Sequence, residues 1–147
     1  MENYDANAEQ QVWQRVFAQP GQPPREDLRG LVLSAAELAG VYRKLSGSLT
    51  GRAKELARGL YQGETANVAC LKGLSFLSGG SEEGLRSWNP DKAPVRRQLE
   101  KCYHRTRRCM TEYAARSAEA EFGEVFRRLA DREGQHCAWL AELLGSL

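Results

Sequence analysis

The chain has 147 residues, a net charge of +2 and 41% hydrophobic residues, so it is long enough for one domain with its own core. Basic residues gather around Arg96 and Arg108, but acids are interspersed, which is typical of a solvated helix face and not of a nucleic-acid binder. No apolar stretch approaches the roughly 20 residues of a membrane span, and the N-terminus is too polar for a signal peptide. We therefore expect a cytoplasmic protein with no nucleic-acid partner and no membrane partner.

Residues 1–24 predict a short amphipathic N-terminal helix, with Val12, Trp13, Val16 and Phe17 at helical spacing, followed by a Pro-rich linker. Residues 25–147 predict one further unit of four long helices, at about 25–49, 52–77, 94–117 and 120–144. The apolar stripe of the first of these consists of Leu28, Leu31, Val32, Ala35, Leu38, Ala39, Tyr42 and Leu45. Strand signals are almost absent, so we predict an all-α protein.

The connections between these helices follow a short–long–short pattern. Gly47 to Gly51 form a tight turn, and Gly79 with Gly80 stops the second long helix. The middle connection of about 15 residues extends to roughly 50 Å, whereas a helix of about 26 residues is roughly 39 Å long. The pattern therefore predicts a four-helix bundle with a long crossover between helices 2 and 3.

An internal repeat supports this topology. When the chain is shifted by 69 residues, the segment 55–74 lies over the segment 124–143. The identical pairs are Glu55/Glu124, Arg58/Arg127, Leu60/Leu129, Glu64/Glu133, Ala69/Ala138, Leu71/Leu140 and Leu74/Leu143. Tyr42 and Tyr113 extend the repeat into helices 1 and 3 at a shift of 71. A duplicated helical hairpin is the simplest interpretation.

The repeat also contains the chemistry of the chain. Glu133 and His136 are three positions apart on one helix, so they share a face and can bind one metal ion together. The matching pair in the first half is Glu64 and Asn67, in which Asn replaces His. The sequence thus contains one complete Glu-x-x-His pair and one incomplete pair.

The four cysteines, Cys70, Cys102, Cys109 and Cys137, contain no C-x-x-C pair, which argues against a zinc knuckle or a thioredoxin-type site. Cys102 and Cys109 are seven positions apart and share a helix face, which suits core packing. Cys70 follows Asn67 by one turn, and we expect it to be a buried structural thiol.

In these segments the chain resembles the ferritin-like superfamily, and within it the rubrerythrin-like proteins. The resemblance extends from about Leu28 to Leu144, apart from the crossover. Three segments carry it: Glu37-Leu-Ala-Gly-Val-Tyr42-Arg-Lys-Leu, Glu64-Thr-Ala-Asn67-Val-Ala-Cys-Leu-Lys-Gly and Phe126-Arg-Arg-Leu-Ala-Asp-Arg-Glu133-Gly-Gln-His136. It implies a ferritin-like fold and iron or manganese bound for oxygen or peroxide chemistry or iron handling. The metal ligands that it implies are Glu37, Glu64, Glu133 and His136.

The match to that family is incomplete at two positions. Asn67 replaces the second His, and Arg108 stands where a carboxylate of helix 3 is expected. Two Fe(II) ions bring four positive charges that three carboxylates do not neutralise, and Arg cannot become a ligand.

Two hypotheses therefore remain open. The first is a reduced site for one iron or manganese ion in oxidative-stress or iron metabolism, with electrons from an external donor protein. The second is a metal-free, non-catalytic scaffold or partner-binding module, in which an inward-pointing Arg108 neutralises the buried carboxylates. In both cases we expect a homo-oligomer, most simply a dimer.

Overall fold

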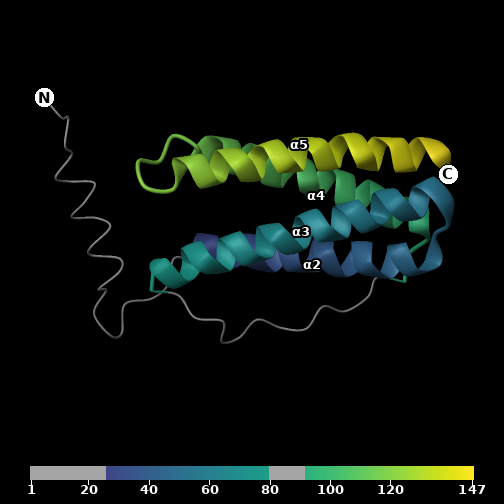
Figure 1. The fold of residues 1–147 in the computed structure, drawn as a ribbon, viewed down its shortest axis with the longest axis horizontal. Helices are drawn as coiled ribbons and strands as arrows, with labels where there is room; N and C mark the ends of the chain where they lie inside the picture. The colour runs from purple at the N-terminus through teal and green to yellow at the C-terminus, as the bar shows by residue number, and fades with distance from the viewer. Residues whose placement is uncertain (1–25, 80–91) are drawn as a thin grey trace, which may run out of the picture.

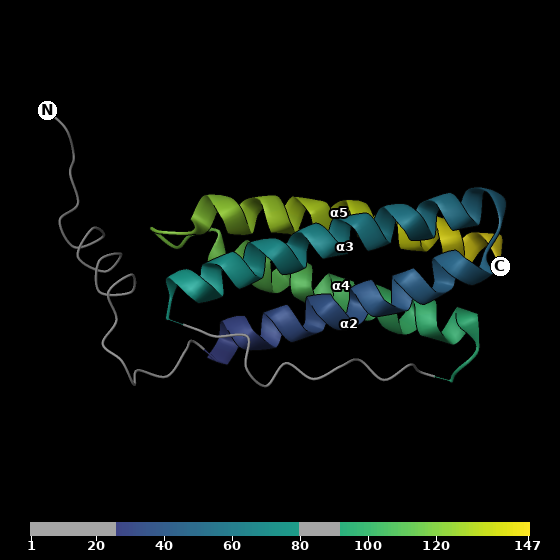
Figure 2. The same ribbon diagram turned by 60° about the horizontal axis from the view of Figure 1, so that its bottom comes forward.

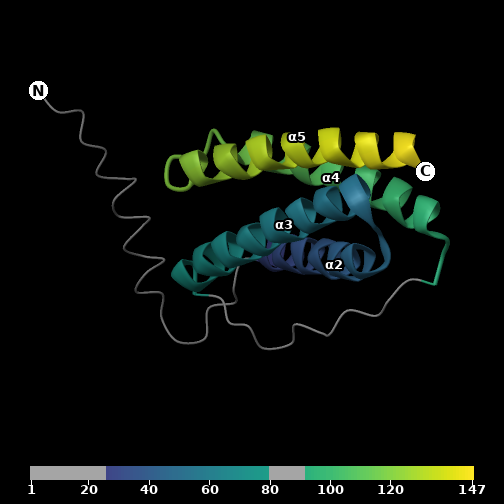
Figure 3. The same ribbon diagram turned by 45° about the vertical axis from the view of Figure 1, so that its right-hand side comes forward.

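The structure is a computed structural model that describes residues 26–79 and 92–147. This part of the chain forms four α-helices and no strand: α2 (Glu26–Ser48), α3 (Gly51–Leu77), α4 (Val95–Arg116) and α5 (Gly123–Ser146). The helices form two antiparallel hairpins, α2–α3 and α4–α5, which lie face to face (Figures 1 and 3). The prediction of an all-α four-helix bundle is confirmed for the described residues.

The two hairpins are joined across the bundle by α3 against α5 and by α2 against α4. Helices α3 and α4 run in the same direction, so the end of α3 and the start of α4 lie at opposite ends of the bundle (Figures 1 and 2). The predicted crossover falls largely on residues 80–91, and the predicted N-terminal helix on residues 1–24; both lie outside the described residues. None of the four helices combines the length and the apolar character that crossing a membrane requires.

Glycines shape the turns between the helices. Gly51 begins α3 with φ +61°, and Gly79 follows α3 with φ +85°, a conformation that side chains with a Cβ rarely adopt. Helix α5 begins three residues later than the predicted start at residue 120, because residues 117–122 form the reversal after α4. Gly123 closes this reversal, since a Cβ there would overlap the carbonyl oxygen of Ser117.

The buried apolar side chains form two clusters. The first consists of Leu28, Leu31, Val32, Ala35, Leu71, Leu74, Cys109, Tyr113, Phe126 and Leu129. The second consists of Leu38, Tyr42, Leu45, Leu56, Ala57, Leu60, Leu99, Cys102, Leu140 and Leu143. The predicted apolar stripe of α2 is thus confirmed.

A layer of buried polar side chains separates the two apolar clusters along α3, α4 and α5. We call it the polar layer; it consists of Glu64, Asn67, Thr106, Glu133 and His136, none of which is more than 1% exposed. In sequence, each of these residues falls between members of the two clusters on its own helix. Helix α2 contributes no polar residue to this layer, because its inward positions there are Ala35 and Leu38.

Helices α3 and α5 approach closely at two glycines on the face that α3 turns toward α5. A Cβ on Gly63 would overlap Nε2 of His136, and a Cβ on Gly59 would lie 3.2 Å from the ring of Trp139. The rings of His136 and Trp139 are stacked with their centroids 5.8 Å apart. The glycine face of α3 therefore positions His136 inside the bundle.

We predict that Gly63→Ala destabilises the protein by about 1–3 kcal/mol, because the new methyl group displaces the His136 ring from a packed interior. The matched control is Gly73→Ala on the same helix, where a Cβ meets nothing within 4 Å. That change should stabilise the protein by roughly 0.5–1 kcal/mol, since Ala is the better helix former. Urea unfolding measures both; equal effects of the two substitutions would contradict this account of the α3–α5 contact.

Candidate metal centre

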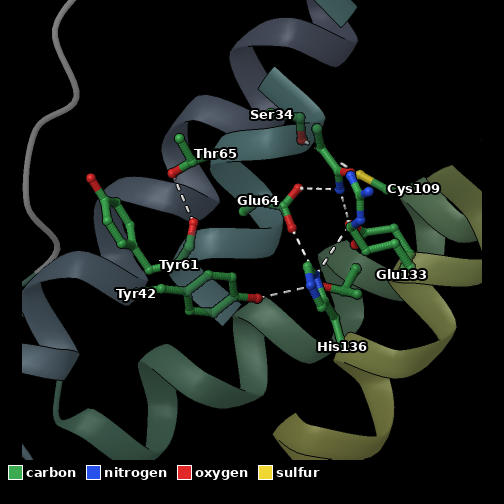
Figure 4. A network of polar contacts seen from close by, with 11 residues as sticks. Ser34, Tyr42, Tyr61, Glu64, Thr65, Cys109, Glu133 and His136 are labelled. Carbon is green, nitrogen blue, oxygen red and sulfur yellow. Dashed lines mark hydrogen bonds and ion pairs between the residues drawn. The ribbon is translucent and has the colours of Figure 1, made fainter. Parts of the chain in front are cut away.

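Three side chains with metal-ligating atoms meet in the middle of the polar layer. Nδ1 of His136 lies 3.0 Å from Oε2 of Glu64 and 3.4 Å from Oε1 of Glu133. One ligand atom from each residue lies within 4.8 Å of the other two. Figure 4 shows Glu64 on α3 directed at His136 and Glu133 on α5. The structure therefore brings together three of the four residues for which a metal-binding role was predicted.

These distances suit a first-row transition metal ion. Such ions bind nitrogen and oxygen donors at about 2.0–2.2 Å, so neighbouring donors are about 2.8–3.6 Å apart at octahedral or tetrahedral angles. The two separations from His136 Nδ1 fall inside this interval. An ion can thus replace the proton that the imidazole shares with the carboxylates without a large movement of the helices.

Asn67, oriented by Arg132, holds the carboxylates from the other side. The Asn67 amide donates to Oε1 of Glu133 at 2.6 Å and to Oε1 of Glu64 at 3.3 Å. Its oxygen accepts a hydrogen bond of 2.8 Å from Arg132. Because a guanidinium group can only donate, the Asn67 oxygen must face Arg132 and its NH₂ group must face the carboxylates. The orientation of this amide is therefore fixed.

Glu133 has one oxygen that this network leaves unsatisfied. Its Oε2 atom is buried and has no hydrogen-bond partner among the described residues. A buried carboxylate oxygen without a partner is costly, so it favours a bound proton or a bound cation. Glu133 lies beside His136 and Glu64, where either a proton or a cation can be shared with these side chains.

The electrostatics of the cluster favour retained protons. Burial raises the pKa of Glu133 to about 7, against the hydrogen bond from His136, and the neighbouring Glu64 adds to the rise. Burial alone would lower the pKa of His136, but its hydrogen bonds to Glu133 and Glu64 raise it to about 9. Both shifts are upward, so near neutral pH the cluster holds protons more tightly than the same side chains do in water.

Glu37, the fourth predicted ligand, lies apart from this cluster. Its side chain is 44% exposed and pairs with Arg105 on the surface between α2 and α4. It lies five positions before the buried Tyr42, which places it about 140° away around the helix. The structure does not bring Glu37 to the polar layer.

Arg108 is also outside the bundle. It is exposed and lines a surface groove of about 540 Å³ between α2 and α4, together with Arg105 and Arg116. The prediction that Arg108 neutralises the buried carboxylates is therefore wrong. The guanidinium that reaches the polar layer belongs to Arg132, which sequence reasoning missed; its signal was its position beside Glu133 and its alignment with Gly63 in the repeat.

The two repeated tyrosines border the layer but are not equivalent. Tyr42 lies 3.4 Å from the hydroxyl of Thr106, whereas the buried hydroxyl of Tyr113 has no partner among the described residues. At the 71-residue shift that relates the tyrosines, Thr106 corresponds to Ala35, which cannot form this bond. Burial raises the pKa of both tyrosines, so they remain protonated and do not act as bases.

The cysteines are free and give no nucleophile beside the cluster. Cys102 and Cys109 are buried, as predicted, and burial raises the pKa of Cys109 to about 11. Cys70 is exposed, so the prediction of a buried thiol there is wrong; Leu71 occupies the buried stripe of α3 instead. A thiol with a raised pKa is a poor nucleophile.

Comparison of the chain with models of known families, with curated proteins and with solved structures finds no match.

We predict that the metal-free protein loses stability as the pH rises from about 4.5 to about 9 because of this cluster. Folding raises the pKa of Glu133 from 4.5 to about 7 and that of His136 from 6.5 to about 9, so the folded chain binds more protons than the unfolded chain. The stabilisation of the folded chain by protonated His136 is fully present below pH 6.5 and is lost as the pH rises through 9. The buried Glu133 carboxyl group is harder to ionise than in the unfolded chain, so it lowers the stability progressively from pH 4.5 through pH 7.

Chemical unfolding of Glu133→Gln isolates this effect, because the substitution removes the Glu133 titration and keeps the side-chain shape. Its stability should fall less than that of the native chain between about pH 4.5 and 7. Glu112→Gln, at an exposed position of α4, is the control and should follow the native curve. Parallel curves for Glu133→Gln and the native chain would contradict the raised pKa of Glu133.

Proposed function

We propose that this protein binds a single divalent transition-metal ion, iron or manganese, through Glu64, Glu133 and His136. The observation that carries the proposal is the meeting of these three buried ligand groups at the separations of a coordination shell. Two carboxylates and an imidazole are suitable ligands for these ions. The unsatisfied Oε2 of Glu133 offers a further donor atom.

Charge favours one ion over two. The carboxylates of Glu64 and Glu133 neutralise one divalent ion in the buried layer, whereas a second ion would leave two positive charges uncompensated. The position that a second histidine would need contains Asn67, whose NH₂ group faces the carboxylates and cannot bind a cation. The site is thus asymmetric although its two helices are repeats.

We also propose a ferritin-like, rubrerythrin-like ancestry for the bundle. The helix directions, the internal repeat and the Glu-x-x-His pair support it. When bound, the ion would supply Lewis-acid or one-electron chemistry in oxidative-stress or iron metabolism. This chain's own residues would hold the ion, exclude bulk water and keep the two tyrosines protonated beside it. An external electron donor and a homodimer belong to the same proposal.

One observation favours a second candidate, a metal-free scaffold or partner-binding module. Asn67 and Arg132 already supply hydrogen bonds and positive charge to the layer, and His136 supplies more. A cluster that is compensated in this way can remain folded without an ion. In this candidate the polar layer fixes the register of the helices.

Metal content after anaerobic reconstitution with Fe(II) or Mn(II) distinguishes the two candidates. We predict about one ion per chain, and a loss of affinity of more than about tenfold in His136→Ala, which removes a ligand. His104→Ala, at an exposed position, is the control and should bind as the native chain does. No stoichiometric metal in the native chain would favour the metal-free candidate, whereas equal binding by His136→Ala would contradict the proposed ligand set.

A further inference from the structure

The internal repeat reveals an exchange of side chains between the two halves of the polar layer. At the 69-residue shift, Asn67 corresponds to His136 and Gly63 corresponds to Arg132. In one half, the large ring of His136 lies against Gly63, which has no side chain. In the other half, the smaller Asn67 contacts the long side chain of Arg132. The pair of His136 and Gly63 in one half thus corresponds to the pair of Asn67 and Arg132 in the other half.

This exchange places a permanent positive charge beside two buried carboxylates. Arginine carries a guanidinium charge, and because Arg132 is partly buried, water screens this charge less than it would at the surface. Its hydrogen bond to Asn67 orients the amide that donates to both Glu64 and Glu133. The charge of Arg132 thereby acts on the carboxylates through one intervening side chain.

We propose that Arg132, acting through Asn67, is the internal counter-charge of the polar layer and competes with a cation bound by Glu64, Glu133 and His136. It is a positioning residue: it stabilises the carboxylates when no ion is bound and repels the ion when one binds. The second part rests on the proposed function, whereas the first part does not. Arg132 therefore sets the balance between the metal-free and the metal-bound protein.

The alternative to this role is simple packing, and the two roles predict different results. If Arg132 only fills space and orders Asn67, its loss weakens both the fold and the metal site. If it is a counter-charge, its loss weakens the metal-free fold but strengthens cation binding, because a like charge has been removed near the ion. The opposite signs of the two effects identify the counter-charge.

The test compares Arg132→Gln, which removes the charge but keeps an amide donor, with Arg132→Lys, which keeps the charge. Arg128→Gln is the matched control, since Arg128 lies one turn earlier on α5, is 77% exposed and pairs at the surface with Glu124. Thermal unfolding of the metal-free proteins and calorimetric titration with Mn(II) supply the two readouts.

For Arg132→Gln we expect a melting temperature lower by roughly 5 °C without metal and an affinity for Mn(II) higher by about tenfold. Arg132→Lys and Arg128→Gln should stay close to the native chain in both. Weaker or unchanged Mn(II) binding by Arg132→Gln, while the native chain binds, would overturn the inference and leave the proposed function intact.

If the native chain binds neither Mn(II) nor Fe(II), the proposed function fails, and the metal-free measurements alone decide the first part of the inference. A melting temperature that falls in Arg132→Gln but not in Arg132→Lys would then support the counter-charge. Equal melting temperatures of these two variants would overturn it.

Discussion

The structure depends on the compensation of two carboxylates enclosed in the middle of an apolar bundle. Glu64 and Glu133 lie between two clusters of buried apolar side chains, where an uncompensated charge is costly. Three groups surround them: the imidazole of His136, the amide of Asn67 and, behind it, the guanidinium of Arg132. This compensation is incomplete, because Oε2 of Glu133 is buried without a hydrogen-bond partner among the described residues and burial raises the pKa of Glu133. A bound divalent cation would complete the compensation of the two carboxylates, and this need for positive charge supports the proposed function.

The same constraint accounts for the packing of α3 against α5. Two carboxylates can share one imidazole only if the His136 ring enters the interface, and Gly63 leaves the space for it. Across the interface, Asn67 is short enough for Arg132 to reach it. The polar layer also favours one helix register, since a slip of one residue on α3 or α5 would rotate its carboxylate by about 100° away from its partners across the interface. Helix α2 contributes Ala35 and Leu38 at this level and the hydroxyl of Tyr42 at its border, and it serves as a wall beside the site.

The sequence predicted the helices and the core of the site well, and for a physical reason. Helical periodicity determines which face each residue occupies, so the stripe of α2 and the shared face of Glu133 and His136 followed from spacing, and the repeat matched Glu64 to Glu133. The family resemblance added the expectation that these three side chains meet. Glu37 and Arg108 were misplaced because family resemblance outweighed that periodicity; each lies five residues before a buried tyrosine, on another face. Arg132 was missed because a long side chain can reach inward from a partly buried position, which periodicity does not reveal. The reversal of residues 117–122 delayed the start of α5 for a similarly local reason, the close contact of Gly123 with Ser117.

Anomalous X-ray diffraction from crystals of the protein grown with Mn(II) tests the central claim most directly. The account predicts one anomalous peak per chain inside the bundle, at about 2.0–2.2 Å from donor atoms of Glu64, Glu133 and His136. It also predicts that Asn67 stays hydrogen-bonded to Arg132 on the far side of the carboxylates. A polar layer with no anomalous peak, while His136 keeps its hydrogen bond to Glu64, would contradict the account, and so would a pair of ions at this position.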